Sequence, residues 1–215
     1  MGNTSIPLWG RLVNIARALH KLQAAPEETT YVFEVLRNSD PHMLDRNIVR
    51  LRKEHGPVFM EKRELIDLFL DKEIPQYGGD TLAGCYQRFI EEHRISPLHL
   101  LDVWRRRGQY PVDRTAAWYL RRDVVCHDLG HLLNNYGTDP VGETEMVWFN
   151  VGQEPGPGWI TLGILGLLRY PTRLLRFYAA FRRGRRSNWL IGSPFDQYAN
   201  ENIEQVRARI IRYAE

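Results

Sequence analysis

CHDLGHLLNNYGTDPVGETE, residues 126–145, contains the signals that end one helix and begin the next. Residues 134–137, NNYG, are turn formers, and we expect Gly137 to take the left-handed conformation that is common after a helix end. Asp139 followed by Pro140 predicts a new helix, because the aspartate accepts an unpaired N–H and the proline presets φ in the first turn. So short a connection predicts two antiparallel neighbouring helices.

Helical signals continue on both sides of this hairpin. Asp113 is suited to cap a long helix that runs to about Asn135. Helical apolar spacing is found over residues 8–22, 64–70 and 81–93, and strand-like alternation is nearly absent. In the first of these segments the expected apolar face consists of Leu12, Ile15, Ala16 and Leu19.

Further Asp-Pro and Ser-Pro pairs predict helix starts at Asp40-Pro41, Ser96-Pro97 and Ser193-Pro194. We therefore predict an all-α fold in which about eight to ten helices form a single multi-helix domain over residues 1–215.

The composition excludes several classes of protein. Of the 215 residues 43% are hydrophobic and 26% charged, which is typical of a globular chain. The net charge of +3 is too small to indicate a nucleic-acid partner. Two cysteines give no disulfide framework, so we expect a reducing, cytoplasmic environment. The most apolar run, residues 159–168, is shorter than the roughly 20 residues that a membrane-spanning helix needs.

Two histidines on the first helix of the hairpin suggest a metal site. At about 100° per residue, His127, His131 and Asp128 share one face, and the two imidazoles are close enough to reach one ion. The antiparallel second helix brings Glu143 back towards His131. From the spacing alone, a metal site and an ordinary solvated helix face both remain open.

Other kinds of site share part of this pattern. The zincin motif H-E-x-x-H is matched only in part, because position 128 is Asp and the general base of those proteases is missing. An HD-type phosphohydrolase would need another histidine and a distal aspartate, for which His93, His99 and Asp196 are available. Asp123 and Glu145 are candidates for holding the imidazole N–H groups, or else they are solvated.

The run His127-Asp128-x-x-His131, eleven residues and then Glu143 resembles the HDxxH-x11-E motif of the coenzyme Q (ubiquinone) biosynthesis protein 4 family. The resemblance extends over about residues 20–210 and includes residues 81–97, 119–123 and 136–143 and Leu162-Gly163. The chain departs from the family pattern at Asp80 and Ala83, where glycines are usual, and at Phe195-Asp196, where Trp-Glu is common.

The resemblance implies an α-helical, often dimeric protein of ubiquinone biosynthesis that binds a polyprenylated quinone precursor or another isoprenoid lipid. It implies a divalent metal, usually zinc, with magnesium, manganese or iron as alternatives. The ligands carried over are His127, Asp128, His131 and Glu143. The implied activity is oxidative decarboxylation of the polyprenyl-hydroxybenzoate ring, a lyase-type reaction whose catalytic residues remain unknown. The alternative is a non-catalytic scaffold that organises other quinone-biosynthesis proteins at the membrane surface.

The apolar run is a candidate for holding a prenyl tail. We expect a groove at Leu162, Gly163, Leu165 and Gly166, since burying each CH₂ contributes about 0.8 kcal/mol. The alternative is a core helix whose glycines allow close packing, and both can hold together. Residues 169–186 interleave arginines with Leu, Phe and Tyr, which is typical either of a helix lying on an anionic membrane or of a solvated flank. We expect peripheral association with the inner face of a membrane.

Overall fold

The computed structural model of the chain describes residues 7–24, 30–56, 59, 67–70, 77–106 and 110–211, and most of these residues are helical. The α-helices are α1 (Leu8–Ala24), α2 (Thr30–Ser39), α3 (Met43–His55), α5 (Asp67–Leu70), α6 (Leu82–Glu92), α7 (Pro97–Arg106), α8 (Arg114–Asn134), α9 (Pro140–Gln153), α10 (Pro157–Arg169), α11 (Leu174–Arg186) and α12 (Ile203–Ile210). One 3-10 turn, η2 (Pro171–Arg173), joins α10 to α11. In these segments β-pairing is limited to one isolated bridge, Thr81 to Asn202, so the all-α prediction is confirmed.

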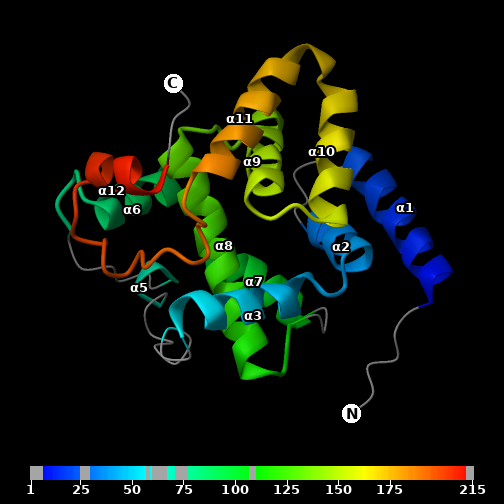
Figure 1. Cartoon of the computed structure of the whole chain (residues 1–215), viewed down its shortest axis with the longest axis horizontal. Coiled ribbons are helices and arrows are strands. Elements are labelled where there is room, and N and C mark those ends of the chain that lie inside the picture. Colours follow the sequence, from blue (N-terminus) through cyan, green and yellow to red (C-terminus); the bar gives the residue numbers. More distant parts are fainter. Residues whose placement is uncertain are drawn as a thin grey trace.

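Helix α8 runs through the middle of the molecule (Figure 1). It is buried on most of its surface, and Val125, Leu129 and Leu133 belong to the main hydrophobic core. Helices α6 and α12 lie on one side of it, and α1, α2 and α10 lie on the other side (Figure 1). Because α8 is enclosed in this way, several of its polar side chains are buried, among them Arg122, Asp128, His131 and Asn134.

A second, smaller core holds α1, α2, α9 and α10 together. Its buried members are Ala18, Val35, Leu36, Val151, Trp159 and Leu162. The helix at residues 8–22 is confirmed as α1, but its predicted apolar face is wrong in part, because Leu12 and Ala16 are exposed. The face towards α2 instead contains Ala18 and Asn14, whose amide donates to Asn38. Residues 64–66 lie outside the described residues, and the predicted segment 81–93 is confirmed as α6.

Local capping signals predicted several helix starts correctly. Asp113 accepts from the N–H of Ala116 at the start of α8. Asp139 accepts from two N–H groups at the start of α9. Helix α7 begins directly after Ser96, as predicted.

Two predicted starts are wrong. Helix α3 begins at Met43 after His42, because Asp40 is buried in an ion pair with Arg46 instead of capping. Residues 193–200 form turns rather than a helix. The carbonyl of Ser193 there accepts from the buried guanidinium of Arg122, which fixes the turn from another part of the fold.

In the described part of the chain, no helix combines the length and the apolar character needed to cross a membrane.

Candidate metal centre

Helices α8 and α9 bring three of the four predicted ligands together. One ligand atom from each of His127, His131 and Glu143 lies within 4.8 Å of the other two. Glu143 reaches the two imidazoles with different oxygens, at 3.5 Å from Nε2 of His127 and 3.4 Å from Nε2 of His131. Within the described residues this is the one group of three such side chains that could share an ion.

The turn between the two helices depends on residues that the motif does not name. Asn135, not Gly137, takes the left-handed conformation at φ 54°, so the prediction for Gly137 is wrong. Asparagine tolerates this region because its short side chain bonds locally. Gly142 is needed instead, because a Cβ there would lie well inside contact distance of the Gly137 backbone. This close approach brings the first turn of α9 against the end of α8.

His131 is held in one tautomer. Its Nδ1 lies 3.0 Å from the carbonyl oxygen of Gly137, which can only accept, so Nδ1 carries the proton. Nε2 is buried and has no hydrogen-bond partner among the described residues, and in the neutral imidazole it presents a lone pair. The nearest group is the Glu143 carboxylate, another acceptor. A buried acceptor that faces a carboxylate fits a cation between them.

Asp128 lies beside this group rather than within it. Its Oδ1 is 3.5 Å from Nδ1 of His127, and its Oδ2 is 3.5 Å from the hydroxyl of Tyr86. A carboxylate in that place orients an imidazole so that Nε2 is available to an ion. Asp128 as a direct ligand stays a prediction.

The carboxylates control the charge of the imidazoles. Burial lowers the pKa of His127, but hydrogen bonds to Asp128 and Glu143 outweigh burial and raise that pKa to about 10. Burial raises the pKa of Glu143, but the neighbouring imidazoles of His127 and His131 have the larger effect and lower it to well below its ordinary value. Without a metal the centre therefore holds a protonated imidazole against an ionised carboxylate.

Asp123 and Glu145, the two candidates for holding the imidazole N–H groups, differ in their position relative to the histidines. Glu145 points away from the histidines and forms a bidentate ion pair with Arg176, at 2.9 and 2.7 Å. Asp123 lies one turn before His127, and both border a small cavity of about 30 Å³ between α8 and α9. Burial raises the pKa of Asp123 to about 6.

Glu154 borders the same cavity and was missed by the sequence reasoning. Burial and the nearby Asp123 raise its pKa to about 7, and its carboxylate accepts from Asn47. In the sequence it stands before Pro155-Gly156, which indicates a loop. Asn47 of α3, Asp123 of α8 and Trp189 surround it from distant parts of the chain, so no local signal could have identified it.

The predicted lipid groove on α10 is occupied by another helix along its glycine stripe. Leu162 is buried, and Leu165 is partly buried. A Cβ at Gly163 would press on the ring of Trp148, and one at Gly166 would meet Thr144, both on α9. The glycines therefore allow close helix packing, as the alternative interpretation expected, and lipid binding at this stripe stays a prediction.

The residues considered for a phosphohydrolase do not join the metal group. His93 lies 3.0 Å from the hydroxyl of Thr138 through its Nδ1. His99 and Asp196 are also outside the group of ligand atoms that the described residues form.

The sequence as a whole matches the family model of "Coenzyme Q (ubiquinone) biosynthesis protein Coq4" over residues 26–212. The chain belongs to the Coq4 family. Curated relatives are named "Ubiquinone biosynthesis protein COQ4 homolog, mitochondrial". The one from Danio rerio is 26% identical over 169 residues, which is 75% of this chain and 60% of the relative. The one from Drosophila melanogaster is 21% identical over 145 residues, 65% of this chain and 52% of the relative.

The chain thus spans about 60% or less of these Coq4 relatives. A crystal structure of a protein from Nostoc punctiforme, named for ubiquinone biosynthesis, has a TM-score of 0.63 and 18% identity to it, covering 93% of this chain and 95% of that one. At that identity the similarity establishes the Coq4 fold alone.

Proposed function

We propose that this Coq4-family chain acts in the biosynthesis of a ubiquinone-type quinone and binds a divalent metal at His127, His131 and Glu143, with Asp128 as a fourth ligand or as a support. The observation that carries the proposal is the buried Nε2 of His131, which has no hydrogen-bond partner among the described residues and faces the Glu143 carboxylate. Two imidazoles with carboxylates suit zinc or iron better than magnesium or manganese, which prefer oxygen ligands.

We propose a catalytic rather than a purely structural centre. The side chain of His131 is 2% exposed, whereas those of His127 and Glu143 are 35% and 40% exposed, so one side of the site is open. Catalytic metal sites keep such an open position. When bound, the ion would supply Lewis acidity towards an oxygen of the ring. The chain would fix the imidazoles through Gly137 and Asp128 and hold the ring against the open side.

The substrate class that we propose is the one that the family resemblance implies, a hydroxybenzoate with a polyprenyl tail. Loss of its ring carboxyl as CO₂ with a hydroxyl in its place is a two-electron oxidation, so the reaction would also need dioxygen or another two-electron oxidant as a co-substrate. The tail would lie on the outer face of α10. That face presents Ile160, Ile164 and Leu168, which are 41%, 49% and 74% exposed. Leu165 and Gly166 border it from the same helix, while Leu162 and Gly163 pack inward.

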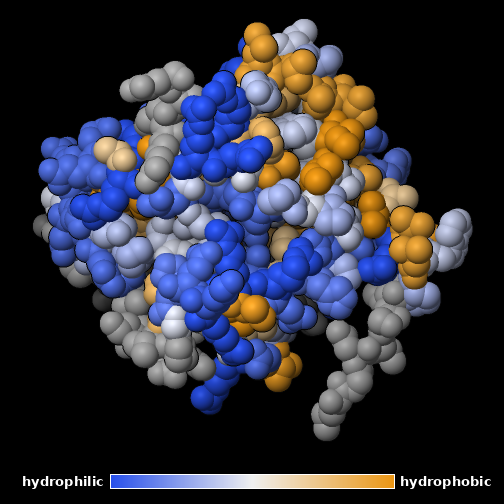
Figure 2. Space-filling model, in the orientation of Figure 1, coloured by the Kyte–Doolittle hydropathy of each residue, from blue (hydrophilic) through white to orange (hydrophobic). Residues whose placement is uncertain are grey.

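A second candidate function is a lipid-binding scaffold at an anionic membrane. Figure 2 shows hydrophobic side chains gathered over the α10–α11 end of the molecule and continuing along α10 towards α1. On α11, Leu174, Leu175 and Tyr178 are exposed beside several arginines. Apolar side chains that enter the interface and arginines that meet anionic headgroups would hold this end on the membrane.

We also propose a protein-binding surface on α1. The exposed apolar residues of α1, which are Leu8, Trp9, Leu12 and Val13, offer a face for a second copy of the chain or for other quinone-biosynthesis proteins. The cytoplasmic placement on the inner face of a membrane likewise stays a prediction, and the curated relatives carry the word mitochondrial in their names.

One experiment separates the two functions. The full chain is freed of metal, loaded with zinc, iron, manganese or magnesium in turn, and supplied with a prenylated hydroxybenzoate, and the product is identified by mass spectrometry. Loss of the ring carboxyl that disappears in His131→Ala but persists in His93→Ala, an exposed histidine outside the centre, supports the enzyme. Binding of the substrate without turnover under any metal supports the scaffold and contradicts catalysis.

A further inference from the structure

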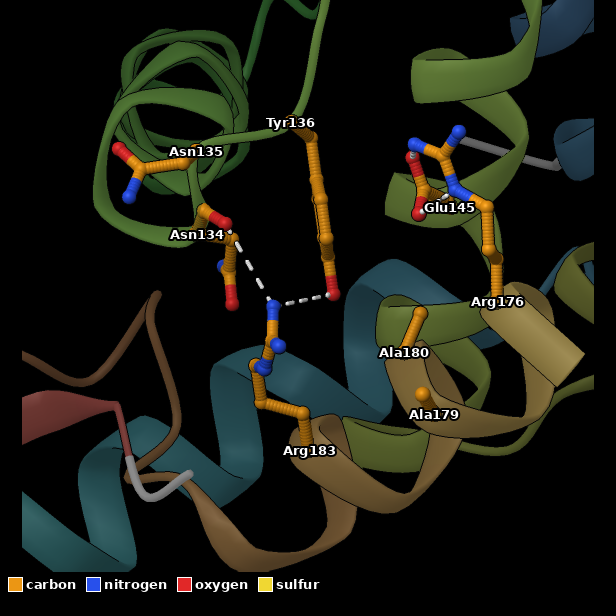
Figure 3. Close-up of a pocket in the computed structure, with 8 residues that line it drawn as sticks. All are labelled: Asn134, Asn135, Tyr136, Glu145, Arg176, Ala179, Ala180 and Arg183. Carbon is orange, nitrogen blue, oxygen red and sulfur yellow. Dashed lines mark hydrogen bonds and ion pairs between the residues drawn. The ribbon is translucent and has the colours of Figure 1, made fainter. Parts of the chain in front are cut away.

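A second cavity lies on the opposite side of α9 from the metal centre. It measures about 280 Å³ and is bordered by the end of α8, by α9 and by α11. Figure 3 shows Arg183 and Asn134 on one wall, the Arg176–Glu145 pair on the other, and Ala179 with Ala180 between them. Glu143 and Glu145 are two residues apart on α9 and so point about 200° apart. The cavity is therefore separate from the proposed metal chemistry.

Among the described residues that border this cavity, arginines outnumber carboxylates. Arg176 and Arg183 border it, against one carboxylate, that of Glu145. Arg176 uses Nε and Nη2 for Glu145, and about half of its side chain remains exposed. Arg183 donates to the hydroxyl of Tyr136 at 3.2 Å, and its guanidinium stays at the cavity wall. Arginine is the side chain best suited to phosphate or carboxylate oxygens.

Asn134 requires that the ligand also donate a hydrogen bond. Its residue is 3% exposed, and its Nδ2 donates to the carbonyl of Gly130 at 2.9 Å, which fixes the orientation of the amide. Oδ1 is therefore an acceptor, and it is buried without a hydrogen-bond partner among the described residues. Figure 3 shows this side chain extending beside the guanidinium of Arg183. A ligand that satisfies the whole cavity must accept from arginine and also donate one hydrogen bond to Asn134.

We propose that this cavity binds a protonated phosphate group, either hydrogen phosphate or a phosphate monoester. The phosphate oxygens accept from Arg183 and Arg176, and the P–OH donates to Oδ1 of Asn134. The second pKa of a phosphate monoester is about 6, and inorganic phosphate keeps at least one proton throughout the neutral range, so a P–OH is available near pH 6.5. Sulfate has the same shape and no proton to donate at this pH, so it leaves Asn134 unsatisfied.

The test is a calorimetric titration of inorganic phosphate into the full chain at pH 6.5 and constant ionic strength, with a chelator present to keep the metal centre empty. Saturable binding is expected, with sulfate at least about tenfold weaker. Ala179→Glu places a negative charge in the cavity from an exposed position and should weaken phosphate binding at least about tenfold, and more than the size-matched Ala179→Gln does. Arg182→Gln removes a charge from the same helix outside the cavity and should leave binding unchanged. Equal binding of phosphate and sulfate, or wild-type affinity in Ala179→Glu, would overturn the proposal.

Vesicles distinguish the two sources of the phosphate group. Phosphatidic acid carries a phosphate monoester, whereas phosphatidylglycerol carries a diester without a titratable proton. Binding to phosphatidic acid vesicles that is lost in Ala179→Glu, with no such loss on phosphatidylglycerol, assigns the cavity to a lipid headgroup. If Ala179→Glu weakens inorganic phosphate binding and leaves both vesicle types unaffected, the cavity takes free phosphate.

Discussion

The carboxylate of Glu143 lies 3.4 Å from Nε2 of His131, although the other nitrogen of that imidazole is already engaged by Gly137. A neutral His131 and an ionised Glu143 thus present two acceptors to each other, the imidazole buried and the carboxylate partly open to solvent. His127 completes the arrangement, because its own Nε2 lies 3.5 Å from the second oxygen of Glu143. This relationship makes the hairpin of α8 and α9 a metal centre in our account, and the first prediction follows from its charge.

Metal affinity should rise with pH. The pKa of His127 in the metal-free chain is raised to about 10, so near pH 7 the imidazole is protonated and an ion must displace that proton. Zinc affinity should therefore increase about tenfold per pH unit between pH 6 and 8. Competition against a chelator of known pH dependence measures this slope. His127→Gln should bind more weakly and with a flatter slope, and a wild-type affinity that is independent of pH would contradict the assignment.

Gly142→Ala should damage both the hairpin and the centre. The new Cβ would collide with the backbone of Gly137, which cannot move aside as a flexible side chain can. We expect a loss of about 1–3 kcal/mol in the free energy of unfolding, typical of overpacking, together with weaker metal binding.

Gly79→Ala is the matched control for this variant, because its Cβ would meet only the end of the Arg88 side chain. Urea unfolding and zinc titration of both variants test the point. Equal stability and equal zinc affinity in the two would show that the close approach is not needed.

Glu154→Gln should make stability less sensitive to pH. The folded chain raises the pKa of Glu154 to about 7, well above its unfolded value, so the native carboxyl keeps its proton at low pH. The protonated Glu154 carboxyl stabilises the folded chain relative to the ionised one. Its contribution to the free energy of unfolding is complete below the unfolded pKa and is lost as the pH rises through about 7. Glutamine stays neutral throughout. From pH 5 to pH 8.5 the free energy of unfolding of the variant should therefore gain about 1–3 kcal/mol relative to the wild type.

Urea unfolding of chelated protein at these two pH values gives the difference. A difference between variant and wild type that stays constant would show that Glu154 does not carry this proton.

Leu168→Ser with Leu175→Ser should weaken binding to anionic vesicles at least about tenfold, since two exposed leucines would no longer enter the interface. Val112→Ser is the matched control, because Val112 is fully exposed between α7 and α8, away from this surface. Vesicle co-sedimentation compares the two variants. If the control weakens binding as much as the double variant, the membrane face has been placed wrongly.

The sequence was informative wherever the determining contacts are local. Asp113 and Asp139 cap α8 and α9 with their own side chains, so their sequence context was enough to predict both starts. Ser193 misled because its carbonyl is held by Arg122, 71 residues away. Glu154 was missed for the same reason, since Asn47 approaches it across 107 residues.

The glycines of α10 were ambiguous for a different physical reason. A stripe of small residues leaves space beside a helix, but the sequence does not say what fills that space. Here Thr144 and Trp148 of α9 fill it. The grouping of His127, His131 and Glu143 was predictable because spacing within α8 and a short turn to α9 suffice to bring these three side chains together.

X-ray absorption at the zinc edge of the loaded full chain tests the central claim most directly. Our account predicts one ion per chain, with scattering from two imidazole rings at about 2.0–2.1 Å and the remaining ligands oxygen. One imidazole should disappear in His131→Ala, while His93→Ala should keep both. A spectrum without imidazole scattering, or one unchanged by His131→Ala, would contradict it.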